Sequence, residues 1–166
     1  MENRVECKIK CEITSSPLDI SKAYEFVSDP AAGAVNLFVG EVRNHHNGKS
    51  VEKLFYDCYP EMGESVLTEI CQTVAATLPL CGIFVQHRYG ELAIGESSVL
   101  IMISSGHRDE SFKACRYIIE RIKLDLPVWK QEFYLGEEAP LWVKCQHHNH
   151  HQADLESLLV VEQESR

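Results

Sequence analysis

The amino-acid sequence predicts an α+β fold with three main helices and several strands linked as hairpins. Residues 5–13, VECKIKCEI, alternate apolar and polar side chains, which is typical of a half-buried strand. Apolar residues recur at helical spacing after Pro60 and again after Asp109, which indicates two amphipathic helices. Short links join neighbouring strand segments, whereas a regular parallel sheet needs long crossovers between its strands.

The predicted elements follow the order strand, helix, two strands, helix, two strands, helix, two strands. After the first strand, residues 15–30 predict a short helix with Ser16 as its N-cap and Pro17 in its first turn. The polar loop between the second and third strands contains Asn47 and Gly48, which favour a turn. The remaining strands are predicted at 32–43, 51–59, 81–90, 97–106, 128–135 and 141–146.

Two of the predicted helices carry an apolar stripe that should face the core. In the helix that begins at Pro60, the stripe consists of Met62, Val66, Ile70 and Val74. In the helix that begins near Asp109, it consists of Phe112, Cys115, Ile119, Ile122 and Leu126. Pro127 should end this second helix, because the residue before a proline disfavours the helical conformation.

Length and composition fit one domain and exclude several classes of function. The chain has 166 residues, 45% of them hydrophobic and 25% charged, with a formal net charge of -9 at pH 7. An acidic chain lacks the clustered basic surface that broad nucleic-acid binding requires. No apolar run approaches the length of about 20 residues that spans a bilayer. The N-terminal segment is charged and lacks the apolar core of a signal peptide. We therefore expect a cytoplasmic protein that binds neither nucleic acid nor membrane.

The cysteines predict free thiols rather than disulfides or metal ligands. Their number, seven, is odd, and no export signal accompanies them. Cys7 and Cys11 lie on the same side of the first predicted strand, about 13 Å apart, which is too far for a disulfide or a shared metal.

The C-terminal segment is expected to be separate from the domain. We predict that residues 1–146 form a single domain and that residues 147–166, rich in histidine and then acidic, form a mobile tail. The tail contains His147, His148, His150 and His151, whose imidazoles suit transition metals, but no further ligand fixes a geometry. We therefore predict neither a metal site nor a cofactor.

Two lysines, Lys123 and Lys130, flank the predicted end of the third helix. Lys123 borders the buried stripe, where its aliphatic stem can rest on apolar surface while its ammonium reaches the edge of a cleft. Lys130 lies on the strand after Pro127, so the two ammonium groups can converge. One lysine of such a pair can serve as a base or nucleophile while the other stabilises a developing anion. The alternative is ordinary positive charge at a helix C-terminus, which the helix dipole favours.

Further positive charge is predicted at two strand ends. At SSGHRDE, residues 104–110, a strand ends and the third helix begins, so free backbone amides and the helix dipole favour a phosphate or carboxylate. His107 and Arg108 add side-chain donors there, although an ordinary capped helix start with solvated charges is an equal alternative. Arg43 ends the most apolar strand and is a weaker candidate, because an arginine at a strand end often faces only water.

Together these motifs resemble the large, catalytic subunit of molybdopterin synthase. The matching segments are FVGEVRNHHNGKSV, YPEM, HRYGELAIGE, SSGHRDESFKACRYIIERIK and PVWKQE, which occur in the right order over roughly residues 5–145. The combination of Gly-x-x-Arg, Ser-x-His-Arg and Lys-x-x-x-Pro-x-Trp-Lys is specific, although each part alone is weak.

The resemblance implies an α/β-hammerhead-like fold with an additional antiparallel β subdomain. It also implies a homodimer of this chain within a heterotetramer, in which a small ubiquitin-like sulfur-carrier subunit binds at each end. The C-terminal Gly-Gly tail of the carrier would enter a pocket of this chain as a thiocarboxylate. As a sulfurtransferase, the chain would pass two sulfur atoms to cyclic pyranopterin monophosphate, forming the dithiolene of molybdopterin in molybdenum cofactor biosynthesis.

The resemblance further implies that Lys123 and Lys130 are the two essential lysines of the family. Lys123 would lie beside the thiocarboxylate terminus, and Lys130 would help in proton transfer or charge stabilisation. Both would also contact the substrate, and which lysine performs which step stays open.

Four more residues match positions of the family's binding site. Arg43 matches the pocket arginine, which would contact both the carrier tail and the substrate, and Phe38 matches an apolar wall of the carrier-tail pocket. His107 and Arg108 match residues that bind the phosphate of the pterin, across the dimer interface.

Two positions depart from the family pattern. Gln146 stands where many bacterial members have an arginine, so that Lys144 or no residue would replace it. Glu41 stands where a small or hydroxyl residue is common. Neither departure affects the lysines.

The sequence leaves alternatives to a sulfur-transfer enzyme. A non-catalytic binding module of the same fold would dock a ubiquitin-like partner without chemistry, and the complete set of basic residues counts against it. A metal-handling protein built on the histidine tail is a third and weaker hypothesis.

Overall fold

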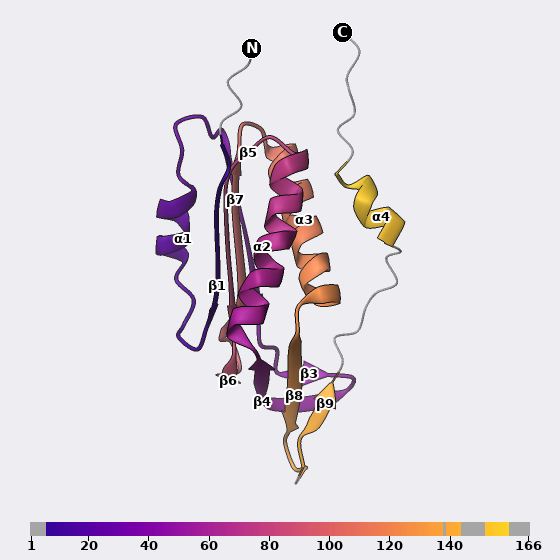
Figure 1. Cartoon of the computed structure of the whole chain (residues 1–166). Coiled ribbons are helices and arrows are strands. Elements are labelled where there is room, and N and C mark those ends of the chain that lie inside the picture. Colours follow the sequence, from indigo (N-terminus) through magenta and orange to yellow (C-terminus); the bar gives the residue numbers. More distant parts are fainter. Residues whose placement is uncertain (1–5, 138, 144–151, 160–166) are drawn as a thin grey trace.

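The larger part of the molecule is a four-stranded sheet with helices on both faces (Figure 1). This computed structural model describes residues 6–137, 139–143 and 152–159. The strand order is β1 (Lys8–Thr14), β5 (Leu80–Arg88), β7 (Ser97–Ser105) and β2 (Ala34–Glu41). β1 is parallel to β5, and the other neighbouring strands are antiparallel. Helices α2 (Pro60–Thr77) and α3 (Arg108–Asp125) cover one face, and α1 (Ile20–Val27) covers the other.

A second, five-stranded sheet lies at one end of the first sheet, the lower end in Figure 1. Its order is β3 (His45–His46), β4 (Lys49–Cys58), β8 (Val128–Tyr134) and β9 (Leu141–Val143), and β6 (Gly90–Ala93) also pairs with β4. All of these pairs are antiparallel. The predicted α+β class with an additional antiparallel subdomain is therefore confirmed.

The main core lies between the four-stranded sheet and the two long helices. Its fully buried side chains include Leu67 and Val74 of α2, Ile83 and Ile101 of the sheet, and Ile118 of α3. Each such burial contributes about 1.5–3 kcal/mol to stability relative to an exposed side chain. This packing fixes α3 along the sheet and thereby determines where the helix ends. Within the described ranges, no helix is long and apolar enough to cross a membrane.

The sequence predicted the period of both long helices correctly but misplaced part of each buried face. Met62 and Phe112, which were expected to be buried, are 56% and 58% exposed. The buried face of α2 is instead Gly63, Leu67, Ile70, Cys71 and Val74. Gly63 allows α2 to approach β1 closely, because a Cβ there would lie 3.1 Å from the side chain of Ile13. Spacing alone does not reveal such a close approach.

One more detail of the helices differs from the expectation, and one helix had no counterpart among the predicted elements. The N-cap of α1 is Asp19 rather than Ser16, and its side chain accepts a hydrogen bond of 3.0 Å from the amide of Lys22. A fourth helix, α4 (Gln152–Ser157), lies inside the segment for which a mobile tail was predicted. Leu155 is buried in the main core, as is Leu159 just beyond the helix. The four tail histidines lie outside the described residues.

The cysteines of the described residues carry free thiols. The contact of Cys11 is not with Cys7 but with Cys71 of α2, at 3.6 Å between the two sulfur atoms. Burial raises the pKa of the Cys115 thiol to about 11, so that this cysteine behaves as an apolar core residue.

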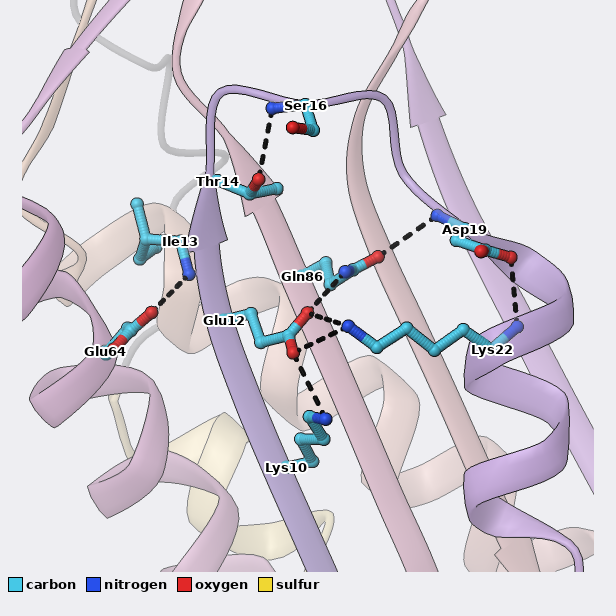
Figure 2. Close-up of polar contacts among 9 residues, drawn as sticks. All are labelled: Lys10, Glu12, Ile13, Thr14, Ser16, Asp19, Lys22, Glu64 and Gln86. Atoms are coloured by element: carbon cyan, nitrogen blue, oxygen red, sulfur yellow. Dashed lines mark hydrogen bonds and ion pairs between the residues drawn. The ribbon is translucent and has the colours of Figure 1, made fainter.

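A network of hydrogen bonds and ion pairs centred on Glu12 connects α1 to the four-stranded sheet (Figure 2). The Glu12 carboxylate accepts hydrogen bonds from Lys22 of α1 at 2.9 and 3.0 Å and from Gln86 of β5 at 2.6 Å, and Lys10 forms an ion pair with it at 3.3 Å. Gln86 in turn accepts a hydrogen bond from the amide of Asp19. Burial opposes ionisation of Glu12, but these donors outweigh it and lower the pKa of the carboxyl group.

We predict that Glu12→Gln lowers the free energy of unfolding by about 1 kcal/mol at pH 7, because the charge-assisted bonds to Lys22 and Lys10 are lost. Since the folded-state pKa lies below the ordinary value of 4.5, the contribution of Glu12 is present above pH 4.5 and disappears as the pH falls through the lowered pKa. Urea unfolding at pH 7 and pH 3 measures this, with the exposed Glu25→Gln as control. An equal loss at both pH values would contradict it.

Candidate active site

The two predicted lysines flank the junction at which α3 turns into β8. The amide of Leu126 closes the helix with a bond of 3.1 Å to the carbonyl of Ile122, and the amide of Val128 donates to the carbonyl of Leu126 at 2.8 Å. Lys123 lies in the last turn of α3 and is exposed, whereas Lys130 is half-buried on β8. Only a tight turn separates the two elements, and the direct approach of the two ammonium groups stays a prediction.

Lys130 forms an ion pair with a buried carboxylate. Its Nζ lies 2.9 Å from Oε1 of Glu132, two residues further along the strand and therefore on the same face. The other oxygen, Oε2, accepts hydrogen bonds from Nδ1 of His46, at 2.7 Å, and from the hydroxyl of Tyr134. Burial opposes ionisation of Glu132, but the hydrogen bonds from Tyr134, Lys130 and His46 outweigh it and lower the pKa of the carboxyl group.

The Arg43 segment reaches the same end of the molecule as Lys130. Val42, just after β2, is buried, and its amide donates a hydrogen bond of 2.9 Å to the carbonyl of Glu96. Arg43 follows it and is exposed. Because His46, three residues later, is bonded to Glu132, the segment that carries Arg43 is held against β8. The structure therefore brings the predicted Arg43 segment and the Lys130 strand together.

Phe38 lies on β2, opposite Ile101 of β7, and is half-buried. Its ring packs against the main core, which includes Ile119 and Ile122 of α3. Gly40 lies next to this ring, and it has no side chain because a Cβ there would lie 2.7 Å from the side chain of Val99. Phe38 thus forms an apolar surface on the strand that leads to Arg43.

His107 and Arg108 lie at the opposite end of α3 from the lysines. His107 is the extended N-cap residue of the helix, and its carbonyl accepts a hydrogen bond of 2.6 Å from the hydroxyl of Ser105. The fifteen residue steps from Arg108 to Lys123 extend over about 22 Å at the rise of an α-helix. Figure 1 shows α3 running from the upper end of the sheet to β8 at the lower end. Within one chain, the predicted phosphate-binding pair is therefore far from the lysine pair.

Most cations of the candidate site differ from the other cations of the protein because they have no carboxylate partner in the described part of the chain. Among the residues that the structure describes, every lysine and arginine forms an ion pair with a carboxylate except Arg43, Arg108 and Lys123. All three are exposed. In an acidic chain, cations without an internal counter-charge are suited to bind an external anion.

Sequence reasoning missed Glu132, the partner of Lys130, together with His46 and Tyr134, which form hydrogen bonds with Glu132. The available signal was the spacing of Lys130, Glu132 and Tyr134, which places three polar groups on one face of a strand. His46 carried no signal, because its contact with Glu132 joins residues 86 positions apart.

Nothing in the described ranges tests the predictions made for the tail. Among the described residues, no group of three or more His, Cys, Asp or Glu side chains is placed to hold a metal ion. The tail histidines, as well as Lys144 and Gln146, lie outside the described residues. The expected mobility of the tail as a whole and the role of these residues stay predictions.

Near Lys130, the rings of Tyr56 and His87 lie next to each other. Tyr56 of β4 is the cross-strand neighbour of Lys130, and its ring stands edge-on to the imidazole of His87, with 5.5 Å between the ring centroids. Burial lowers the pKa of His87 to about 4, although a hydrogen bond to the carbonyl of Arg88 acts in the opposite direction. His87 is therefore neutral at pH 7.

Comparison with known proteins identifies the family of this fold and site. A family model described as MoaE protein matches residues 13–125, which is more than half of the chain. The chain belongs to the MoaE family. The matched range includes Phe38, Arg43, Arg108 and Lys123, and it ends just before β8.

Curated relatives of the chain in the MoaE family are named molybdopterin synthase catalytic subunit. One, from Dictyostelium discoideum, is 40% identical over 139 residues, which cover 82% of this chain and 88% of the relative. Another, from Pyrococcus abyssi, is 34% identical over 143 residues, which cover 85% of this chain and 95% of the relative. Membership therefore places the chain among molybdopterin synthase catalytic subunits, which are enzymes of molybdenum cofactor biosynthesis, as the sequence predicted.

Solved structures of the MoaE family share the fold. A molybdopterin synthase from Staphylococcus aureus matches with a TM-score of 0.72 at 34% identity, covering 80% of this chain and 95% of that chain. A complex of subunits 1 and 2 of molybdopterin-converting factor from Helicobacter pylori 26695 matches with a TM-score of 0.64 at 24% identity, covering 81% of this chain and 90% of that chain. The second likeness supports the fold alone.

We predict that His87→Leu weakens the dependence of stability on pH between about 4 and 6.5. The unfolded chain binds a proton at His87 below its ordinary pKa of 6.5, whereas the folded protein binds it only near pH 4, so stability falls as the pH falls through this window. Removing the imidazole should reduce the difference in unfolding free energy between pH 7 and pH 4 by about 3 kcal/mol. Denaturant titrations at the two pH values measure it, and an unchanged difference would contradict the buried neutral state.

Proposed function

We propose that this chain transfers two sulfur atoms from the C-terminal thiocarboxylate of a small ubiquitin-like carrier subunit to cyclic pyranopterin monophosphate. The observation that carries the proposal is the set of exposed cations that have no carboxylate partner among the described residues, namely Arg43, Arg108 and Lys123. These are positions that the family resemblance assigns to the carrier tail and to the substrate. Both of those ligands are anions, and each needs positive charge that the protein has not already neutralised.

The two lysines suit different parts of this reaction. When the thiocarboxylate sulfur bonds to a carbon of the pterin, the acyl group of the carrier must later take an oxygen from water, so that the carrier leaves as a carboxylate. Lys123, exposed at the end of a helix, can follow the carrier terminus through these changes. Lys130, bonded to Glu132, presents a fixed ammonium toward the charge that develops during sulfur attack.

The length of α3 supports a homodimer. The pair of His107 and Arg108 lies about 22 Å of helix away from Lys123, too far for one small substrate to contact both in a single chain. Two copies packed so that the start of one α3 approaches the end of the other would complete the site. The edge of the described sheet at β2 supports such packing, since Val35 and Leu37 are 40% and 43% exposed there.

The carrier completes the proposed assembly as a heterotetramer. The Helicobacter pylori structure is titled a protein–protein complex of subunits 1 and 2 of molybdopterin-converting factor, and it supports a second, different subunit as the partner. The apolar surface at Phe38 and the cation at Arg43 suit a slender tail that ends in a negative charge. We expect the assembly to act in the cytoplasm.

The alternative is a binding module of the same fold that docks the carrier without chemistry. The ion pair between Lys130 and the buried Glu132 counts against this alternative, because docking a carboxylate terminus requires only exposed cations. Turnover with both substrates separates the two functions.

We predict that purified chain, thiocarboxylated carrier and cyclic pyranopterin monophosphate together yield molybdopterin, and that Lys123→Ala lowers the rate by about 10²–10⁴-fold. Carrier binding, measured by calorimetry, should be largely kept. Lys10→Ala, on the opposite face of the sheet, removes the same charge and serves as control. If the wild-type chain binds active carrier but forms no product, the binding module is the correct function.

We predict that mixed dimers of Lys123→Ala and Arg108→Ala copies regain activity that neither variant has alone. In a mixed dimer, one of the two sites combines the intact Lys123 of one copy with the intact Arg108 of the other. Random pairing should restore about a quarter of the wild-type activity, because half of the dimers are mixed and each has one working site. Co-expression with two affinity tags measures this, and no recovery in the mixed fraction would show that each site is built from one chain.

A further inference from the structure

We propose that His46 is a positioning residue for Lys130 and that it acts through the buried carboxylate of Glu132. The inference rests on the proposed function only for the role of Lys130 in sulfur transfer. The contacts themselves are features of the fold. No part of the family resemblance assigns a role to His46.

The carboxylate of Glu132 is shared between two sets of donors. Its side chain is 3% exposed, so the protein rather than water must supply its hydrogen bonds. Oε2 accepts from Nδ1 of His46 and from the hydroxyl of Tyr134, and Oε1 accepts from Nζ of Lys130. His46 and Tyr134 therefore fix the orientation of the carboxylate plane, and this orientation determines where Lys130 is held.

The geometry also determines where protons lie. An ionised carboxylate only accepts hydrogen bonds, so Nδ1 of His46 must carry a hydrogen, and the hydroxyl of Tyr134 must donate its own. The same hydrogen bond, with burial, raises the pKa of Tyr134 to about 12. The other charged groups that face this cluster are Lys49, whose Nζ lies 5.1 Å from the centre of the Tyr134 ring, and Glu137, which binds Lys49 at 2.8 Å.

His46 belongs to a different strand from the other residues of this cluster. Tyr134, Glu132 and Lys130 belong to one strand, and the alternation of β8 already places them on one face. His46 belongs to β3, in the segment that follows Arg43, and its bond to Glu132 joins that segment to β8. The imidazole of His46 thus couples the position of the segment that carries Arg43 to the orientation of the Glu132 carboxylate, which holds Lys130.

Loss of the His46 imidazole should weaken the ion pair between Glu132 and Lys130. Without His46, Oε2 of Glu132 keeps Tyr134 as its described donor, and a buried carboxylate with fewer donors is less stable in its ionised form. Glu132 then holds Lys130 less firmly, and the ammonium is no longer presented in one position. The side chain should become more mobile and more reactive.

The test uses the full chain with three variants. His46→Ala removes the donor, whereas His46→Asn places an amide NH₂ close to the position of Nδ1. His45→Ala is the matched control, because the neighbouring His45 is exposed and bonds only to Asn44 among the described residues. Two readouts are used: steady-state kinetics with carrier and pterin, and acetylation of Lys130 by acetic anhydride, followed by mass spectrometry.

We expect His46→Ala to lower kcat about tenfold or more, with KM for the carrier changed less than about twofold, since a charge-assisted hydrogen bond behind Lys130 is lost. Acetylation of Lys130 should rise about threefold as the ion pair loosens, while that of Lys10 should stay constant. His46→Asn should restore both values, and His45→Ala should match the wild type. A merely structural role would instead lower the thermal midpoint and leave the labelling ratio of the two lysines unchanged.

Acetylation needs no substrate, so it separates this inference from the proposed function. If labelling of Lys130 rises in His46→Ala although the chain transfers no sulfur, the positioning role stands and the proposed function fails. If His46→Ala keeps wild-type labelling, the inference is overturned, whatever the kinetics show. Should His46→Ala not fold, Tyr134→Phe removes the other donor to Oε2, and unchanged labelling in that variant overturns the inference equally.

Discussion

The direct junction of α3 with β8 is the constraint on which the rest of the structure depends. Leu126 and Pro127 alone separate the two elements, and Leu126 is itself buried in the main core. The packing of α3 on the four-stranded sheet therefore determines where the second sheet begins, because β8 is central to that sheet and pairs with both β4 and β9. A longer loop would uncouple the two sheets, and the lysines on either side of the junction would lose their fixed relation.

Most cations of the described residues have a carboxylate partner, and the exceptions are residues of the candidate site. Exposed ion pairs such as that of Lys49 and Glu137 contribute little stability, but they leave few of the described cations free to attract anions elsewhere. Lys130 has a carboxylate partner in Glu132, whereas Lys123, at the other side of the same junction, has none among the described residues. An acidic surface around a few unpaired positive charges repels anions in general and admits them at one place.

Much of the fold could be predicted from local sequence pattern, and the failures share a physical reason. Alternation and helical period located the long strands and the three main helices, because burial of one face imposes these periods. The rotational phase of a helix depends on the neighbours against which it packs, so Met62 and Phe112 were misplaced. In α2, Gly63 allows the close approach to β1 that sets this phase.

The site was predictable only in part for the same reason. The lysines and arginines were recognisable from motifs that lie close together in the sequence, and their order supported the family. The groups around Glu132, the partner of Lys130, were not, because the contact of His46 with Glu132 arises only when β3, β4 and β8 have assembled into the second sheet. The opposite ends of α3 also show that a set of residues typical of one site need not meet within one chain.

One feature near the end of the described chain bears on how the molecule is made. Leu155 and Leu159 are buried in the main core together with side chains from β1 near the other end of the described chain. During synthesis, this part of the core stays open until the segment around α4 has left the ribosome. A chain that stops at residue 146 would therefore leave the part of the core that Leu155 and Leu159 cover exposed to water.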